Sequence, residues 1–280
     1  MKSINDILKY GEEKLKEATE DYLIDAKLLL EFVLDKDSLY IFMNKDKDLS
    51  DAEIEKYEAV LKRRFAGEPL QYIVGQQAFM GLDFYVAPGV LIPRSDTENL
   101  VTKVIEKIKS SGYQTVLDIG TGSGAIHISL CHYLESIHCT TVDISEDAIK
   151  IAKKNAEALN VKDRVKYVKS DVFENIDETF DVIVSNPPYI PTEVIDGLQK
   201  ELFHEPKIAL DGGQDGYDFY RRIIKESPKY LNNHGLLAFE VGHDQSRVIE
   251  ALLIEAGFID VEIHQDLSGI ERVVLARYER

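Results

Sequence analysis

Five residues between a short apolar strand and a helix have the composition of a ligand-binding turn. Gly120-Thr121-Gly122-Ser123-Gly124 follows a strand expected over 115–119 and leads directly into a helix expected over 125–134. Alternating glycines let the backbone touch a ligand, and the N–H groups at the start of the helix point toward it. The loop is too short for a Walker A motif and lacks its Lys-Ser/Thr ending. Its spacing also differs from G-x-G-x-x-G, which argues against a nicotinamide enzyme.

Acidic residues at two further strand ends extend this pattern. Asp143 ends a strand about twenty residues later, where a carboxylate can accept both hydroxyl hydrogens of an adenosine ribose. Asp171 ends the strand after that and can accept from an adenine amino group, while Val172 adds apolar contact. Taken alone, Asp171 is equally consistent with a surface turn. Together the three strand ends fit one adenosine-bearing cofactor. The pattern resembles the S-adenosylmethionine-dependent methyltransferases with a seven-stranded Rossmann-like sheet.

The sequence Asn186-Pro187-Pro188-Tyr189 ends a fourth strand and is suited to holding a methyl acceptor. An amide nitrogen is a poor nucleophile, and fixing its two N–H hydrogens aims the nitrogen at a methyl donor. The side-chain oxygen of Asn186 and the carbonyl of Pro187 would be the two acceptors. The prolines stiffen the segment and remove competing N–H donors, and Tyr189 can lie against a planar amide or base. No strong general base is required. A rigid surface loop is the structural alternative.

The spacing of apolar residues differs between two regions of the chain, and it predicts the helices and strands that position these residues. Residues 1–75 show only helical spacing, which predicts a small helical domain, and residues 76–94 are expected to form a hairpin linker. From residue 95 to 280, helices of ten to fifteen residues alternate with short apolar strands, which predicts a mainly parallel α/β sheet. Strands are expected over 115–119, 139–144, 164–170, 180–185, 236–241, 261–265 and 271–278. In such sheets ligands bind beyond the carboxyl ends of the strands.

Composition narrows the class of partner. The formal net charge of −17 disfavours a nucleic-acid substrate, since phosphate binding normally requires a basic face. No apolar run is long enough for a transmembrane helix, and the N-terminus lacks a signal-peptide profile. Cys131 and Cys139 are interpreted as reduced, buried thiols. The histidines have no metal-ligand spacing, so no metal is expected. We therefore expect a cytoplasmic protein that binds no membrane.

Motifs outside the strand ends resemble one family, the release factor glutamine methyltransferases, also called PrmC or HemK. The resemblance covers nearly the whole chain. It rests on Leu91-Ile92-Pro93-Arg94-Ser95-Asp96-Thr97-Glu98, Glu205-Pro206, Ala209-Leu210-Asp211-Gly212-Gly213, Phe239-Glu240-Val241-Gly242 with Gln245, and Asp266-Leu267-Ser268-Gly269-Ile270-Glu271-Arg272. It implies methyl transfer from S-adenosylmethionine, leaving S-adenosylhomocysteine. The acceptor would be the side-chain amide nitrogen (N5) of glutamine in the Gly-Gly-Gln motif of class 1 peptide chain release factors, which supports translation termination.

The resemblance also implies roles for residues. The loop from Gly120 to Gly124 would bind the methionine part of the cofactor, Asp143 the ribose, Asp171 and Val172 the adenine, and Asn186 both cofactor and substrate. Asn186 through Tyr189 would clamp the glutamine, with Asn186, Pro187 and Tyr189 as the catalytic set. Arg94, Thr97 and Glu98 would border the pocket, and the role of Glu240 is open. Family members usually have proline where this chain has Ser95, and some have an aromatic residue in place of Val172. The helical domain is expected to recognise the release factor.

Two other functions use the same features. A methyltransferase acting on adenine N6 or guanine N2 of nucleic acid shares the Asn-Pro-Pro-Tyr motif, but it would need a basic groove that this acidic chain does not offer. A regulatory module that only binds adenosine would have no use for the Asn186 acceptor site. The favoured hypothesis is therefore a protein-glutamine methyltransferase.

Overall fold

The structure is a computed structural model that describes residues 2–280, and it contains two compact units. Unit 1 comprises the chain up to Gln76 together with the short segment Gln199–His204. Unit 2 comprises Gln77–Leu198 and Glu205–Arg280. Within residues 2–280, none of the helices is both long enough and apolar enough to cross a membrane.

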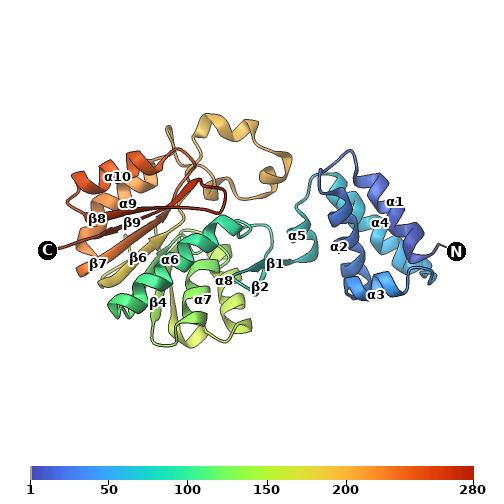
Figure 1. The fold of residues 1–280 in the computed structure, drawn as a ribbon, viewed down its shortest axis with the longest axis horizontal. Helices are drawn as coiled ribbons and strands as arrows, with labels where there is room; N and C mark the ends of the chain where they lie inside the picture. The colour runs from blue at the N-terminus through green and yellow to red at the C-terminus, as the bar shows by residue number, and fades with distance from the viewer. Residues whose placement is uncertain (1) are drawn as a thin grey trace. The chain divides into compact units, whose positions relative to one another are not determined.

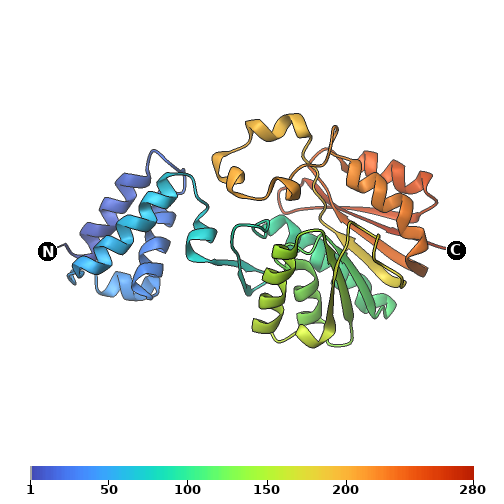
Figure 2. The same ribbon diagram turned by 180° about the vertical axis from the view of Figure 1, so that it is seen from behind.

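Unit 1 is helical, as its periodicity predicts. Its helices are α1 (Ile4–Leu15), α2 (Tyr22–Leu34), α3 (Ser38–Met43), α4 (Asp51–Phe65) and α5 (Leu70–Val74), and Figure 2 shows α1 to α4 in blue packed against one another. Ser3 and Ser50 each begin a helix through a capping box. The serine hydroxyl accepts the backbone N–H of the third helical residue, and the acidic side chain of that residue accepts the backbone N–H of the serine. Tyr57 is fully buried, and its hydroxyl donates to the carbonyl of Ala26 at 2.8 Å.

One ion pair in unit 1 is buried. Arg64 Nε lies 2.6 Å from Asp25 Oδ2, and each side chain is 7% exposed. Arg64 Nη1 also lies 3.2 Å from Glu201 Oε1, in the short segment assigned to the same unit. Burial raises the pKa of Asp25, and the hydrogen bond and charge of Arg64 act in the opposite direction. The guanidinium therefore neutralises a carboxylate that has little water around it.

Unit 2 is built on a seven-stranded sheet with the order β5-β4-β3-β6-β7-β9-β8, and the predicted α/β class is confirmed. Strands β3 to β7 run parallel, whereas β9 pairs antiparallel with both β7 and β8. The strands are β3 (Thr115–Ile119), β4 (His138–Asp143), β5 (Val165–Lys169), β6 (Phe180–Ser185), β7 (Leu231–Glu240), β8 (Ile259–Gln265) and β9 (Glu271–Arg277). Strand order reverses between β3 and β6, which places a ligand site at their carboxyl ends.

Helices cover both faces of this sheet. Figure 1 shows α6 (Ser95–Ser111), α7 (Ala125–Tyr133) and α8 (Glu146–Ala158) on one side, and α9 (Asp218–Glu226) and α10 (Ser246–Glu255) on the other. Alternate strand residues enter separate cores: Val116 and Val184 pack with α6 and α7 residues, while Leu117 and Ile183 pack with those of α9 and α10. Burial on both faces explains why the central strands are almost continuously apolar.

The predicted hairpin is formed by β1 (Gln76–Phe79) and β2 (Leu82–Tyr85). The hairpin is an integral part of the α/β unit, because Phe79 and Phe84 are buried in the core beneath α6 and α7. Glu98 Oε1 accepts the Met80 N–H at 2.6 Å, which fixes the turn of the hairpin against the start of α6. Residues Gln77–Tyr85 thus belong to unit 2.

Candidate active site

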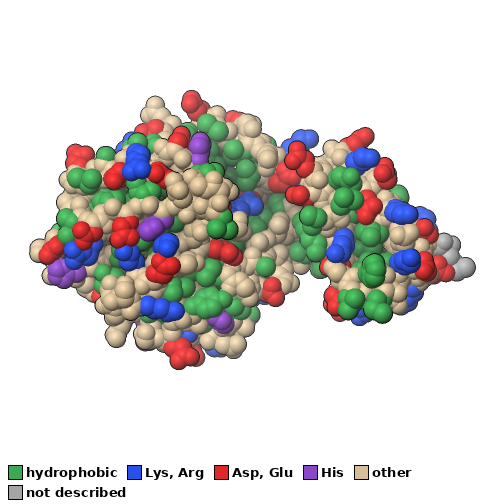
Figure 3. All heavy atoms as spheres, in the orientation of Figure 1, with side chains coloured by type: hydrophobic (Ala, Val, Ile, Leu, Met, Phe, Trp, Pro, Cys, Tyr) green, Lys and Arg blue, Asp and Glu red, His purple; other side chains and the backbone are tan. Residues whose placement is uncertain are grey.

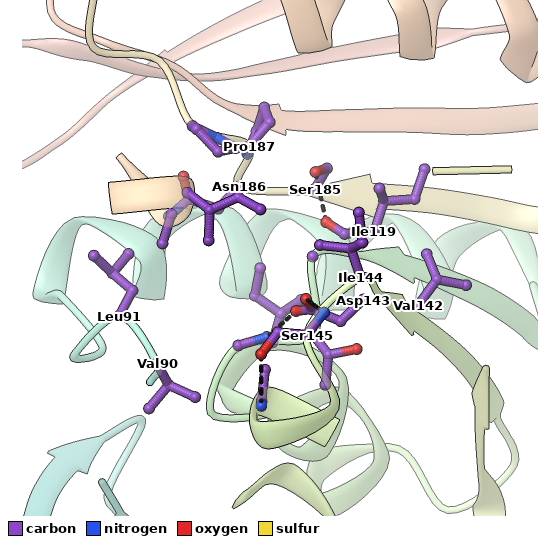
Figure 4. A pocket seen from close by; sticks show the side chains of 18 of the residues that line it. Val90, Leu91, Ile119, Val142, Asp143, Ile144, Ser145, Ser185, Asn186 and Pro187 are labelled. Atoms are coloured by element: carbon purple, nitrogen blue, oxygen red, sulfur yellow. Dashed lines mark hydrogen bonds between the residues drawn. The ribbon is translucent and has the colours of Figure 1, made fainter. Parts of the chain in front are cut away.

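A cavity of about 310 Å³ lies at the carboxyl ends of β3, β4, β5 and β6 in unit 2. Four of the five residues of the glycine loop line it, Gly120 to Ser123. The lining also includes Asp143, Asp171, Val172, Asn186, Pro187 and Pro188. Figure 4 shows Asp143 and Ser145 on one side of this space, with Asn186 and Pro187 on the other. The four strand ends selected from the sequence therefore converge on one cavity.

The glycine loop is shaped by left-handed backbone conformations that favour glycine. Gly120, Gly122 and Gly124 have φ values of +89°, +51° and +90°. A Cβ on Gly124 would lie 2.4 Å from Ile128 Cδ1, so that glycine is needed for packing of the following helix. A Cβ on Gly120 would meet no protein atom within 4 Å. The open space beside Gly120 is where the loop can bring its backbone against a ligand.

The carboxylate of Asp143 is held rigidly at the edge of the cavity. Its Oδ2 accepts the Gly122 N–H at 3.0 Å, and its Oδ1 accepts the Ser145 N–H at 2.9 Å. Burial raises the pKa of Asp143, while these backbone hydrogen bonds lower it. Each oxygen keeps a lone pair for a further donor, so this group has the geometry to accept two vicinal hydroxyls. Ser145, in turn, caps α8 by accepting the Ala148 N–H.

Asp171 already has a partner in the protein. Arg222 on α9 lies 2.6 Å from Asp171 Oδ1 through Nη1 and donates from Nη2 to the Asp171 carbonyl at 3.1 Å. Val172 is buried in the cavity wall with a φ of +52°, an uncommon conformation for a β-branched residue. The Ser170 hydroxyl donates to the Val172 carbonyl at 3.0 Å and stabilises this turn. Arg222 also lines the cavity and was not predicted, since it lies on a distant helix.

Asn186 follows directly on β6, where Ser185 anchors the strand by donating to the Ile119 carbonyl at 2.7 Å. Asn186 Nδ2 donates to Thr97 Oγ1 at 3.2 Å, and both residues line the cavity. Pro187 is buried and Pro188 half-buried. The predicted side-chain acceptor thus lies at the cavity with its amide group already oriented by a neighbour.

The segment after the prolines is fixed by a glycine-rich turn. Gly212 N–H donates to the Ile190 carbonyl at 2.8 Å, and a Cβ on Gly216 would lie 2.4 Å from the Tyr189 carbonyl oxygen. Gln245 Nε2 joins the two stretches by donating to the carbonyls of Tyr189 at 3.1 Å and Gly216 at 3.2 Å. This close packing fixes the glycine-rich turn before α9 against the segment that follows the prolines.

Tyr189 and the three residues expected to border the pocket have different positions. Among residues 2–280, Tyr189 does not line the cavity. Its side chain packs instead against the core beneath α9 and α10, where burial raises the pKa of the Tyr189 hydroxyl. Thr97 and Arg94 line the cavity, whereas Glu98 holds the hairpin instead. Arg94 also forms an ion pair with the buried Glu205.

Comparison with known proteins identifies the family. The family described as PrmC N-terminal domain matches residues 6–75, and the methyltransferase small domain matches residues 96–216. A release factor glutamine methyltransferase of Clostridium acetobutylicum is 41% identical over 278 residues, covering 98% of each chain. One of Clostridium botulinum is 44% identical over 279 residues, covering 98% of this chain and 99% of the other. The chain belongs to the release factor glutamine methyltransferases.

This assignment confirms the predicted enzyme class, a methyltransferase that uses S-adenosylmethionine as its methyl donor. Among solved structures, a methyltransferase from Pyrococcus furiosus has the same fold, with a TM-score of 0.53 and 21% identity, and the match covers 72% of this chain and 92% of the other.

In this member of the release factor glutamine methyltransferases, a loop that sequence reasoning did not place closes part of the cavity. Pro206, Ile208 and Ala209 contribute to the lining. Glu205 holds the base of this loop by accepting the Ile92 N–H at 3.1 Å as well as pairing with Arg94. The signal was present only as the Glu205-Pro206 dipeptide of the family resemblance, because the contact joins residues more than a hundred positions apart.

Proposed function

We propose that the cavity of unit 2 binds S-adenosylmethionine beside Asn186 and Pro187, and that these two residues hold the acceptor glutamine. The acceptor is the Gly-Gly-Gln glutamine of a class 1 peptide chain release factor, which is methylated on its side-chain nitrogen. The observation that carries this proposal is the position of Asn186, at the end of β6 and in the wall of the same cavity as the glycine loop and Asp143.

The cofactor site fits the proposed ligand in three respects. The space beside Gly120 allows close approach to the backbone, and the oriented oxygens of Asp143 suit the ribose hydroxyls. Val172 offers an apolar surface for adenine. Asp171 can use its remaining acceptor capacity toward an amino group, since Arg222 binds its Oδ1 and carbonyl. When bound, S-adenosylmethionine supplies an electrophilic methyl group on a sulfonium sulfur.

The chain contributes orientation to the chemistry. The lone pair of an amide nitrogen is delocalised into its carbonyl, so productive attack depends on alignment with the methyl group. Asn186 Oδ1 and the Pro187 carbonyl can each accept one N–H of the glutamine amide, which leaves the nitrogen face directed toward the methyl group. Pro187 and Pro188 have no N–H groups that would compete for these acceptors. Once methylated, the nitrogen becomes acidic and loses its proton without a strong base.

The acidic composition supports a protein acceptor over nucleic acid, since the chain has a formal net charge of −17. A cytoplasmic location is part of the proposal, since release factors act there during translation. The test is incubation of the enzyme and labelled S-adenosylmethionine with three acceptors: release factor, release factor with the glutamine replaced, and DNA or rRNA. Label on the intact factor alone is expected, and label on nucleic acid with none on the factor would overturn the proposal.

The role of Asn186 is tested with Asn186→Ala. Loss of one acceptor misaligns the glutamine, so transfer should fall by about 100-fold or more while cofactor affinity stays close to that of wild type. Asn233→Ala is the matched control, because Asn233 is an exposed residue whose Oδ1 accepts only the Arg280 N–H in the described structure. A large loss of cofactor affinity in Asn186→Ala would show that Asn186 serves the cofactor instead of the acceptor.

Unit 1 is proposed to recognise the body of the release factor. Its helices α2 and α3 carry large apolar side chains at the surface, visible in green in Figure 3, among which Phe42 is 78% and Met43 73% exposed. Such a patch is typical of a protein-binding surface. Replacing Phe42 and Met43 with serine should raise KM for intact release factor about tenfold and leave methylation of a short Gly-Gly-Gln peptide unchanged. Equal effects on both substrates would contradict this role.

A further inference from the structure

A buried carboxyl group lies directly behind Asn186. Glu240 ends β7, which pairs with β6 in a parallel register that sets Ser185 beside Phe239. Asn186 follows Ser185 directly after the end of β6, and Glu240 follows Phe239 as the last residue of β7. Glu240 is only 3% exposed, and its Oε2 has no hydrogen-bond partner among residues 2–280. Glu240 is outside the cavity lining, so it has no direct access to a ligand there.

The side chains of Asn186, Thr97 and Glu240 lie next to one another at this point. Asn186 Nδ2 donates to Thr97 Oγ1 at 3.2 Å, and the Thr97 and Asn186 side chains lie close enough to the Glu240 carboxyl group to favour its ionised form. The buried Oε2 of Glu240 thus has acceptor capacity that no group among residues 2–280 uses. An ionised carboxyl group only accepts, so the single hydroxyl proton of Thr97 is directed to Glu240.

This arrangement decides which way the Asn186 amide points. With its proton given to Glu240, the Thr97 oxygen is available only as an acceptor. Asn186 must therefore present its NH2 group to Thr97 and Glu240, and its Oδ1 points elsewhere. If the amide were turned over, Oδ1 would face the Glu240 oxygen with no hydrogen between them, and the NH2 group would face the NH2 group of the substrate.

We propose that Glu240 is a positioning residue, which acts through Thr97 to hold Asn186 with Oδ1 directed at the acceptor amide. This inference rests on the proposed function of Asn186 as an acceptor of the glutamine N–H. It assigns a role to a buried acid that the chemistry of methyl transfer does not otherwise use.

The surroundings of Glu240 distinguish positioning from proton transfer. Burial and the nearby Asp96 raise the pKa of Glu240 to about 7, while Thr97, Arg272 and Asn186 act in the opposite direction. The Tyr220 hydroxyl, from α9, donates to the Glu240 carbonyl at 2.8 Å, and burial together with the charge of Glu240 raises the pKa of both Tyr220 and Tyr189. A protonated carboxyl group still keeps one oxygen that only accepts, so the orientation of Asn186 persists on both sides of the Glu240 pKa.

The test compares matched substitutions in the full-length enzyme, with intact release factor and labelled S-adenosylmethionine. Glu240→Met removes the acceptor and should lower kcat at least tenfold, with the cofactor Kd within twofold of wild type. Glu240→Gln keeps an acceptor oxygen and should restore most of the activity. Thr97→Val should lower kcat as Glu240→Met does, whereas Thr97→Ser keeps the hydroxyl and should be close to wild type.

The decisive readout is coupling to Asn186. In an Asn186→Ala background, Glu240→Met should have no further effect on kcat, because there is no amide left to orient. A further tenfold loss in that background, or equal activities of Thr97→Ser and Thr97→Val, would overturn the inference. If Glu240→Met does not fold, the two Thr97 variants carry the test.

Two controls separate this inference from its premises. Wild-type enzyme that leaves release factor unlabelled contradicts the proposed function, whereas an active wild type with an equally active Glu240→Met contradicts only the role of Glu240. The pH profile of kcat should be the same for wild type and Glu240→Gln near pH 7, with no inflection in wild type that the variant lacks. Such an inflection would make Glu240 a proton acceptor and refute the positioning role.

Discussion

The glycines of the cofactor loop differ in what an added methyl group would meet, and this difference predicts distinct phenotypes. At Gly124 the φ of +90° would cost an alanine about 1–2 kcal/mol. Its Cβ would also lie 2.4 Å from Ile128 Cδ1 and 3.2 Å from Ala152 Cβ, and overpacking of this kind costs about 1–3 kcal/mol. Gly124→Ala should therefore reduce the free energy of unfolding by about 2–5 kcal/mol.

Two other glycines separate these contributions. Gly112 ends α6 with a φ of +72°, and a Cβ there would meet no atom within 4 Å. Gly112→Ala should thus show the backbone cost alone, about 1–2 kcal/mol. Gly120→Ala has the same open protein environment, at a φ of +89°, but its methyl group would enter the space assigned to the cofactor. It should be as stable as Gly112→Ala and bind S-adenosylmethionine more weakly.

Urea unfolding of the cofactor-free proteins measures the first effect, and calorimetric titration with S-adenosylmethionine measures the second. Gly112→Ala should bind the cofactor as wild type does. The reasoning is refuted if Gly124→Ala is no less stable than Gly112→Ala, or if Gly120→Ala retains wild-type affinity for the cofactor.

Three further predictions concern charged groups. Arg64→Met leaves Asp25 buried without a partner and should lower the free energy of unfolding by about 3–5 kcal/mol, against about 0–1 for Arg63→Met at the exposed pair beside it; equal losses in urea titrations would contradict this. Asp143→Asn loses acceptor capacity and should weaken S-adenosylmethionine binding about 10- to 100-fold by calorimetry, so an unchanged Kd would exclude the ribose role. The pKa of Glu240 is raised from 4.5 to about 7, so its stabilising contribution is fully present below pH 4.5 and decreases by about 3 kcal/mol as the pH rises through 7. Urea titrations at pH 5 and 8 should show this loss in wild type and its absence in Glu240→Gln.

The regular elements of the sheet were largely predictable from sequence, because burial on both faces makes the central strands continuously apolar. The strand expected over 180–185 is observed at those residues. β7 begins earlier than expected, at Leu231, since its first residues include Asn232, Asn233 and His234, which have no apolar pattern. The helices α3 and α5 span only six and five residues, too short for periodicity to indicate them.

From residue patterns alone, the candidate site was predictable only where residues follow strand ends directly, whereas Arg94 and Thr97, which also line the cavity, were expected from the family resemblance. The strand-end rule found the glycine loop, Asp143, Asp171 and Asn186, which converge on the cavity. Arg222 was missed, because its pairing with Asp171 depends on how α9 packs against the sheet. The role of Glu240 also could not be read from sequence, since it depends on the register of β6 with β7. Tertiary pairing of distant residues is the information that local patterns do not contain.

The two prolines at the acceptor site have a consequence for how its occupancy can be observed. Pro187 and Pro188 carry no amide hydrogen, so backbone hydrogen exchange and amide-detected NMR give no signal for these two residues. The Asn186 side-chain NH2, hydrogen-bonded to Thr97, is a spectroscopic reporter within the site, and the next hydrogen-bonded backbone amide is that of Ile190, which donates to the Leu210 carbonyl at 3.0 Å. Selective labelling of asparagine side chains is therefore the most direct way to follow the glutamine as it enters.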